Sequence, residues 1–210
     1  MTGAPRTGEA REEAPAPTGT EPQYRGLRMS AEEFLALPDD GFRYELVEGV
    51  VVMSPSPTLR HQAVAMEIAI QIGTYLREHP VGHVFPESDV HVGKGLRGGD
   101  LVYRPDLVFV RAERLPRTPD ETLSGPPDLV VEVVSPGSRR YDAETKRQDY
   151  ERLGVREYWL VDPERGAMTF LRLEGGRFVE PPAGGETFAS EAVPGFALDL
   201  VRVRKSFNPW

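Results

Sequence analysis

The stretch from Pro126 to Ser138, "PPDLVVEVVSPGS", decides the fold class of this protein. Residues 128–134 form an almost continuous apolar run, and most of its apolar members are β-branched. Neither face of this predicted strand alternates to polar residues, so we expect both faces to be covered, as in the central strands of α/β proteins. Glu132 interrupts the run, and a buried ionised carboxylate is costly unless a partner compensates it. The central question is therefore what Glu132 does.

The segments that follow this strand predict a mixed sheet flanked by helices. Residues 135–154 predict a helix that ends at Gly154, and residues 157–162 predict another strand. A strand, a helix and a second strand in this order indicate a βαβ unit within a mixed sheet. Short β-rich segments between residues 167 and 200 predict a C-terminal antiparallel meander. The expected class is α/β (α+β).

The segments that precede the strand predict a short helix and a hairpin. Residues 30–37 begin with Ser30 and carry Glu33 three residues later, which is the pattern of a helix capping box. Residues 42–54 contain two β-rich runs on either side of Glu48-Gly49, a dipeptide that suits a tight turn.

The middle of the chain predicts one long helix and two strands. Residues 54–80 are the longest helical candidate, and residues 83–93 and 104–111 predict strands. We expect the buried stripe of the long helix to consist of its regularly spaced apolar residues, Leu59, Ala63, Met66, Ile70 and Leu76. His61 lies near the start of this helix, where we expect a histidine on the surface, and an approach to the site is the alternative.

Length and composition indicate one domain and exclude several classes of protein. The chain has 210 residues, no cysteine and a net charge of −8. Residues 1–26 are rich in Pro, Gly, Ala, Thr and Glu, which predicts a disordered tail before a single domain at residues 27–210. No apolar run approaches the roughly 18 residues of a membrane span. We expect a cytoplasmic protein without disulfides, and the acidic balance argues against broad non-specific binding of nucleic acid.

Asp106 and Lys146 are the first candidates to act with Glu132. Asp106 follows Pro105, which belongs at the start of a strand because it cannot donate to a sheet ladder. Lys146 shares a helix face with Tyr150, so it is expected along the buried stripe. The alternatives are a turn residue for Asp106 and, for Lys146, a side chain that extends to solvent.

Glu45 is the third candidate, on the opposite face of its strand from Tyr44 and Leu46. A solvated residue on the outer face of the hairpin is the alternative for Glu45, and a carboxylate paired with an arginine is the alternative for Glu132. Carboxylates at several strand positions beside a lysine suit a hard divalent cation such as Mg²⁺ or Mn²⁺, which prefers oxygen ligands. The lysine could then orient water or stabilise charge on a phosphate.

Four motifs occur in order and span about residues 29–201: "YELVEGVVVMSPSP" followed by "RHQ", "RPDLVFV", "PPDLVVEVVSPGSRRYDAETKRQDYERLGVREYWLVDP" and "FALDL". They resemble the motifs of the Uma2 family of restriction-endonuclease-like proteins. The resemblance implies the restriction-endonuclease-like fold of PD-(D/E)xK nucleases. It implies metal ligation by Asp106, Glu132 and Glu45, and a catalytic role for these three residues together with Lys146.

One position departs from the general superfamily pattern, in which the lysine stands two residues after the acidic residue. Val134 occupies that position, and Lys146 matches the place on the following helix to which Uma2-like chains move the lysine. Two functions follow as hypotheses. The first is a Mg²⁺-dependent endonuclease that hydrolyses phosphodiester bonds in DNA, possible as a homodimer by analogy with nucleases that cut both strands. The alternative is a non-catalytic module with the nuclease fold that binds nucleic acid or a protein partner.

Overall fold

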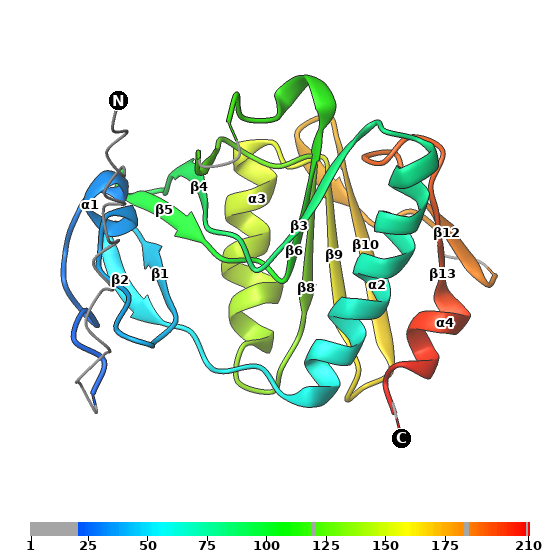
Figure 1. Ribbon diagram of the computed structural model, residues 1–210, viewed down its shortest axis with the longest axis horizontal. Helices are drawn as coiled ribbons and strands as arrows, with labels where there is room; N and C mark the ends of the chain where they lie inside the picture. The colour runs from blue at the N-terminus through cyan, green and yellow to red at the C-terminus, as the bar shows by residue number, and fades with distance from the viewer. Residues whose placement is uncertain (1–20, 119–120, 183–184, 209) are drawn as a thin grey trace, which may run out of the picture.

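The computed structural model describes residues 21–118, 121–182, 185–208 and 210, and its main sheet has six strands (Figure 1). The central pair, β8 and β9, is parallel, and the other pairs of this sheet are antiparallel. The predicted mixed sheet is therefore confirmed. In spatial order the strands are β11 (Arg177–Val179), β10 (Ala167–Glu174), β9 (Glu157–Asp162), β8 (Leu129–Val133), β6 (Leu107–Arg111) and β3 (Gly82–Pro86).

A second sheet and a short strand pair accompany the main sheet. The second sheet contains the predicted hairpin, in which Glu48 and Gly49 both have positive φ angles, of 52° and 72°. Glycine suits such a turn because it adopts a positive φ at little cost. The second sheet has the order β2 (Val50–Met53), β1 (Tyr44–Val47), β5 (Asp100–Tyr103), β4 (Val90–Lys94) and β7 (Leu123–Ser124), and the pair consists of β12 (Thr187–Ala189) and β13 (Ala197–Asp199).

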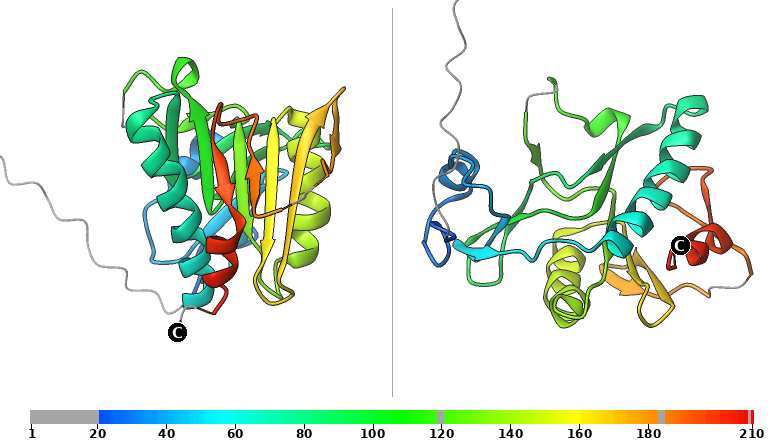
Figure 2. Two further views of the ribbon diagram at one scale, coloured as in Figure 1. Left: turned by 90° about the vertical axis from the view of Figure 1, so that its right-hand side faces the viewer. Right: turned by 60° about the horizontal axis from the view of Figure 1, so that its bottom comes forward.

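Helices cover both faces of the main sheet (Figures 1 and 2). The predicted capping box is present at the first helix, where Ser30 Oγ accepts from the Glu33 amide at 3.3 Å and Glu33 accepts from the Ser30 amide at 2.7 Å. The α-helices are α1 (Ala31–Leu35), α2 (Leu59–Glu78), α3 (Arg147–Leu153) and α4 (Leu200–Lys205), with a 3₁₀ turn η1 (Ala112–Arg114) and a π-helix η2 (Tyr141–Lys146). None of the described helices has both the length and the apolar character that a membrane span requires.

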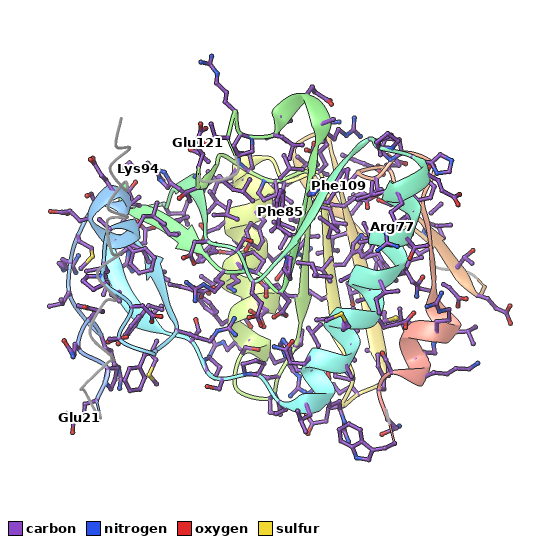
Figure 3. All side chains as sticks on the ribbon, in the orientation of Figure 1. Glu21, Arg77, Phe85, Lys94, Phe109 and Glu121 are labelled. Carbon is purple, nitrogen blue, oxygen red and sulfur yellow. The ribbon has the colours of Figure 1, made fainter. Side chains whose placement is uncertain are left out.

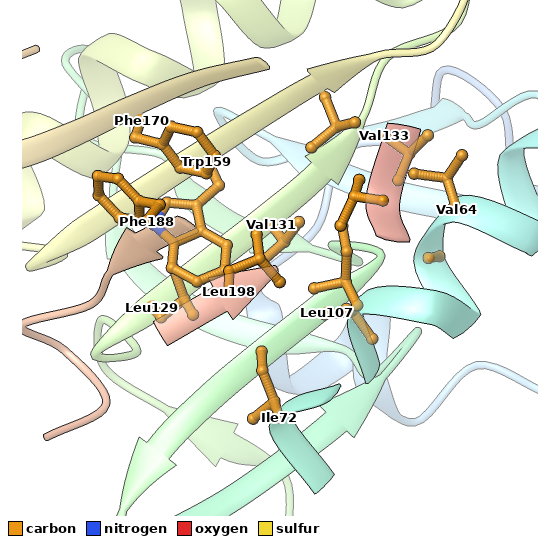
Figure 4. Close-up of a cluster of buried hydrophobic side chains, with 14 of the residues drawn as sticks. Val64, Ile72, Leu107, Leu129, Val131, Val133, Trp159, Phe170, Phe188 and Leu198 are labelled. Atoms are coloured by element: carbon orange, nitrogen blue, oxygen red, sulfur yellow. The ribbon is translucent and has the colours of Figure 1, made fainter. Parts of the chain in front are cut away.

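Strand β8 is buried on both faces, as its apolar sequence predicts. On one face Leu129, Val131 and Val133 pack with α2, Trp159 and the β12–β13 pair (Figure 4). On the other face Val130 packs with residues of α3 and of the second sheet. Side chains alternate along a strand, so Glu132 shares the face of Val130 at the end of β8.

The buried face of α2 differs from the predicted stripe. Leu59, Met66 and Ile70 are 73%, 58% and 47% exposed, whereas Val64 and Ile68 are fully buried against the sheet. Helix α2 carries two apolar rows, and local spacing does not distinguish them. Packing on the sheet buries the row that contains Val64 and Ile68.

Two predicted elements are divided in the structure. Residues 83–93 do not form one strand but supply β3 and β4 to different sheets, and Glu87 between them has a positive φ of 44°. β5, which was not predicted, pairs between β1 and β4. Within residues 135–154 the predicted helix is present from residue 139, but residues 141–146 form the π-helix η2 before α3.

The predicted boundary at residue 26 stays a prediction, because residues 1–20 lie outside the described part of the chain. Among residues 21–26, the Tyr24 ring contacts the Tyr44 ring edge-on at 5.7 Å, and the Gly26 amide donates to the Val51 carbonyl oxygen at 2.8 Å. These contacts attach the segment to the β1–β2 hairpin.

Candidate active site

The four residues singled out from the sequence line one cavity of about 390 Å³. Glu45 comes from β1, Asp106 immediately precedes β6, Glu132 is in β8, and Lys146 ends η2. All four are at least 90% buried. The cavity lies where α2 and η2 begin, at the end of the molecule that comes forward in the right-hand view of Figure 2. The fold thus assembles the predicted site from four separate segments.

Lys146 is the cation around which three of the acidic side chains gather. Its Nζ lies 2.8 Å from Glu132 Oε1, 2.9 Å from Glu45 Oε1 and 3.8 Å from Asp142 Oδ1. The predicted inward face of Lys146 is confirmed, and its extension to solvent is excluded. Glu45 is buried rather than solvated, and its Oε1 also accepts from the Arg104 amide at 3.0 Å.

Two tyrosines complete the surroundings of the ammonium. Nζ of Lys146 lies 5.4 Å from the ring centre of Tyr103 and 5.5 Å from that of Tyr141, within the range of cation–π attraction. The Tyr103 hydroxyl donates to Asp149 Oδ2 at 2.6 Å, which fixes its ring. The ammonium is therefore held by carboxylates and flanked by aromatic rings.

The π-helix η2 explains how Tyr141, Asp142 and Lys146 reach the same cavity. A π-helix has a wider turn than an α-helix and is found most often at functional sites. Asp142 and Lys146 are buried in it, and Tyr150 continues the buried row on α3. Sequence periodicity predicted the direction of Lys146 and Tyr150, but not the wider turn or the approach of Asp142.

Asp106 joins β6, β8 and α2 through its two carboxylate oxygens. Its Oδ2 accepts from the Val133 amide at 2.6 Å, just beyond the point where β6 and β8 cease to pair. Its Oδ1 lies 2.7 Å from His61 Nε2. The Asp106 side chain thus accepts from a β8 amide that lies beyond the paired part of β6, which begins after Pro105 and Asp106. A simple turn role for Asp106 is therefore excluded.

His61 reaches the site, which was the alternative to a surface position, and its contact with Asp106 was not predicted. The expectation of a surface histidine is wrong, because its side chain is only 14% exposed and faces Asp106. The Thr58 hydroxyl accepts from the His61 amide at 3.2 Å and begins α2 there. The only sequence signal was its place in "RHQ", since its partner lies 45 residues further along the chain.

The site carries more negative than positive charge. Four carboxylates line the cavity beside one lysine, and its two arginines, Arg43 and Arg104, pair with acidic residues outside the lining. Burial raises the pKa of Glu132 well above its usual range, and the nearby carboxylates add to this effect while Lys146 opposes it. Burial likewise raises the pKa of Asp142. Burial disfavours the ammonium of Lys146, but Glu132, Glu45 and Asp142 outweigh this and hold its pKa well above the usual range.

This surplus of buried carboxylates fits a hard divalent cation by its donor chemistry. Asp106, Glu132 and Glu45 could supply oxygen ligands. In the part of the chain that the structure describes, no three acidic or histidine side chains form a ready-made metal cluster. The reason is visible at Lys146, whose Nζ lies within 3 Å of both glutamates and takes the place of a shared cation.

The fold resembles that of a crystallised bacterial protein. The structure matches "a putative nuclease belonging to DUF820 from Anabaena variabilis ATCC 29413" with a TM-score of 0.69 and 19% sequence identity. The match covers 85% of this chain and 99% of that chain. At this identity the likeness shows a shared fold, which is that of a protein described as a nuclease.

The family follows from the sequence itself. Residues 31–201 match the model of the Uma2 family, whose description is "Putative restriction endonuclease". The chain therefore belongs to the Uma2 family, as its motifs predicted. No match was found among the curated proteins.

Proposed function

We propose that this protein is a Mg²⁺- or Mn²⁺-dependent endonuclease that hydrolyses phosphodiester bonds in DNA. The observation that carries the proposal is the convergence of Glu45, Asp106 and Glu132 with Lys146 in one cavity at the end of the sheet. A structural role alone gives little reason to bury this many carboxylates around one ammonium. Membership of a family described as restriction endonucleases supports the same reaction class.

The acidic side chains would bind the metal ion, and the lysine would interact with the phosphate. Asp106, Glu132 and Glu45 would hold the ion, which when bound offsets negative charge on the scissile phosphate. Lys146 keeps its proton at neutral pH, since its pKa is raised, so it acts as a hydrogen-bond donor and not as a base. An ammonium of this kind stabilises a phosphate oxygen as charge develops on it. His61 holds Asp106 Oδ1 in place.

The proposal is tested by cleavage of supercoiled plasmid and single-stranded DNA with Mg²⁺, Mn²⁺ or EDTA. The wild-type protein should cut with metal and not with EDTA. The Asp106→Asn variant should lose at least about 100-fold in rate, as expected when one electrostatic element of a site is removed. Asp162→Asn is the matched control, because Asp162 is equally buried, at 8% exposed, but is not among the residues lining the cavity. Equal cleavage by both variants would exclude this site.

A non-catalytic binding module is the second candidate. The specific observation in its favour is that Lys146 already pairs with Glu45 and Glu132 at 2.9 and 2.8 Å. Such pairing satisfies two carboxylates without an ion. Absence of cleavage together with DNA binding would support this candidate. The cytoplasmic location and the homodimer stay predictions, the latter testable by the mass of the protein in solution.

A further inference from the structure

A second cavity, of about 640 Å³, adjoins the candidate active site. The two cavities share Val47 of β1 and Val52 of β2 as lining residues. The second cavity is further lined by Thr145 and Gln148, which lie on either side of Lys146 along η2 and α3. The second cavity therefore lies beside the active-site cavity along the β1–β2 hairpin.

The cations of this second cavity are available to a ligand. Arg28 and Arg97 line it, both side chains are exposed, and neither forms an ion pair with a described residue. By contrast, the two arginines in the lining of the active-site cavity are bound. Arg43 pairs with Glu87 at 3.0 Å, and Arg104 pairs with Asp89 at 2.7 Å.

The acidic side chains of the second cavity are already occupied. Glu48 accepts from the Arg97 amide at 2.9 Å and from the Gly99 amide at 3.1 Å. Asp149 is 6% exposed and accepts from the Tyr103 hydroxyl at 2.6 Å. Two backbone amides therefore hold the half-buried Glu48, and the exposed charged side chains of the cavity are its arginines.

The lining also indicates which part of a nucleic acid would lie there. Bases are bound by stacking on aromatic rings, whereas phosphates are bound by arginine and by hydroxyl or amide groups. Among the described residues no aromatic side chain lines the second cavity. Its wall combines aliphatic side chains of the hairpin and Leu96 with the polar side chains of Arg28, Arg97, Thr145 and Gln148. This chemistry suits the sugar–phosphate backbone of a strand and not a stacked base.

We propose that the second cavity binds phosphates of the substrate strand on one side of the bond that is cut. The inference rests on the proposed function for the identity of the strand. The strand would run from the active site past Val47 and Val52 to Arg28 and Arg97. The two arginines position the backbone and do not read its sequence.

The test uses the full-length protein and a fluorescent single-stranded DNA of twelve nucleotides, with EDTA present so that binding is measured without cleavage. Arg28→Ala/Arg97→Ala is compared with Arg77→Ala/Arg204→Ala, which changes the net charge equally. Both control arginines are exposed and form no ion pair with a described residue. Arg77 lies on α2, well away from the hairpin (Figure 3).

The cavity variant should bind the DNA at least about tenfold more weakly than the parent protein. The slope of log affinity against log salt should become shallower by about 1.4, which is the loss of two phosphate contacts on a single strand. The control variant should change neither quantity. Gln148→Glu, which adds a negative charge to the wall without removing an arginine, should also weaken binding.

Three outcomes would overturn the inference: no binding by the parent, equal weakening by both double variants, or unchanged binding by the cavity variant and by Gln148→Glu. The proposed function fails separately. If binding depends on Arg28 and Arg97 but no DNA is cut with Mg²⁺ or Mn²⁺, the second cavity stands and the endonuclease proposal falls. If DNA is cut but its binding does not depend on Arg28 and Arg97, the endonuclease proposal is supported and the proposal for the second cavity is wrong.

Discussion

Replacing Glu132 with glutamine distinguishes a metal site from a structural ion pair. The substitution keeps an oxygen that can accept from Lys146 Nζ, now 2.8 Å from Glu132 Oε1, and Glu45 stays 2.9 Å away on its other side. Burial and neighbouring carboxylates raise the pKa of Glu132, so the charged form of this side chain is disfavoured without an ion. The metal-free stability of Glu132→Gln should therefore stay within about 1 kcal/mol of wild type.

A divalent ion should change this balance. Mn²⁺ at 100 times its dissociation constant should stabilise the wild-type fold by about 2.7 kcal/mol, or roughly 5–10 °C in melting temperature for a domain of this size. Glu132→Gln removes a ligand and should lose most of that shift. Lys146→Met leaves the carboxylates of Glu45, Glu132 and Asp142 without their shared cation, so it should cost about 3–5 kcal/mol in EDTA.

The assay is a thermal melt of the three proteins at pH 7.5, each with EDTA and with saturating MnCl₂. Urea unfolding at fixed temperature converts the shifts to free energies. One result would refute the reasoning: a wild-type melt that ignores Mn²⁺, together with a loss of about 3–5 kcal/mol in Glu132→Gln under both conditions. Glu132 would then be a structural partner of Lys146, and the metal proposal would fall.

Two further predictions concern stability away from the site. Although burial raises the pKa of Asp162, hydrogen bonds from Arg139 and from the Arg165 amide hold it below its usual value. Asp162 thus stabilises the fold at neutral pH and loses this effect as pH falls through the lowered pKa. Asp162→Asn should therefore lose about 1–2 kcal/mol at pH 7, and the difference from wild type in urea unfolding should shrink as the pH falls through that pKa. Trp159→Ala should lower the free energy of unfolding by about 3–5 kcal/mol, because Trp159 is fully buried. Trp210→Ala is the control: Trp210 is 86% exposed, so the urea midpoint should stay unchanged. Equal losses of stability in the two variants would contradict the assigned core.

Much of the fold followed from local pattern. The apolar run of β8 predicted a strand covered on both faces, because a strand without polar alternation has no face to present to water. Ser30 and Glu33 predicted the start of α1, and Glu48-Gly49 predicted the hairpin turn, because capping and turn geometry depend on residues a few positions apart.

Local pattern was insufficient where two arrangements satisfied it equally. Helix α2 has two apolar rows, and only packing on the sheet buried the row of Val64 and Ile68 while leaving Met66 exposed. The wider turn of η2 is a second feature that local sequence pattern did not predict. In it Lys146 lies beside Tyr103, Glu45 and Glu132 of other segments, and periodicity along one helix contains no information about those contacts.

The candidate site divides in the same way. The sequence alone determined that Glu132 needs a partner, because an unpaired carboxylate in a buried strand is costly, and its motifs nominated Glu45, Asp106 and Lys146. Only the tertiary structure decided which atoms meet: Lys146 between two glutamates, and His61 against Asp106. Those contacts join distant segments, so they are set by how the sheets and helices pack and not by the spacing of residues along the chain.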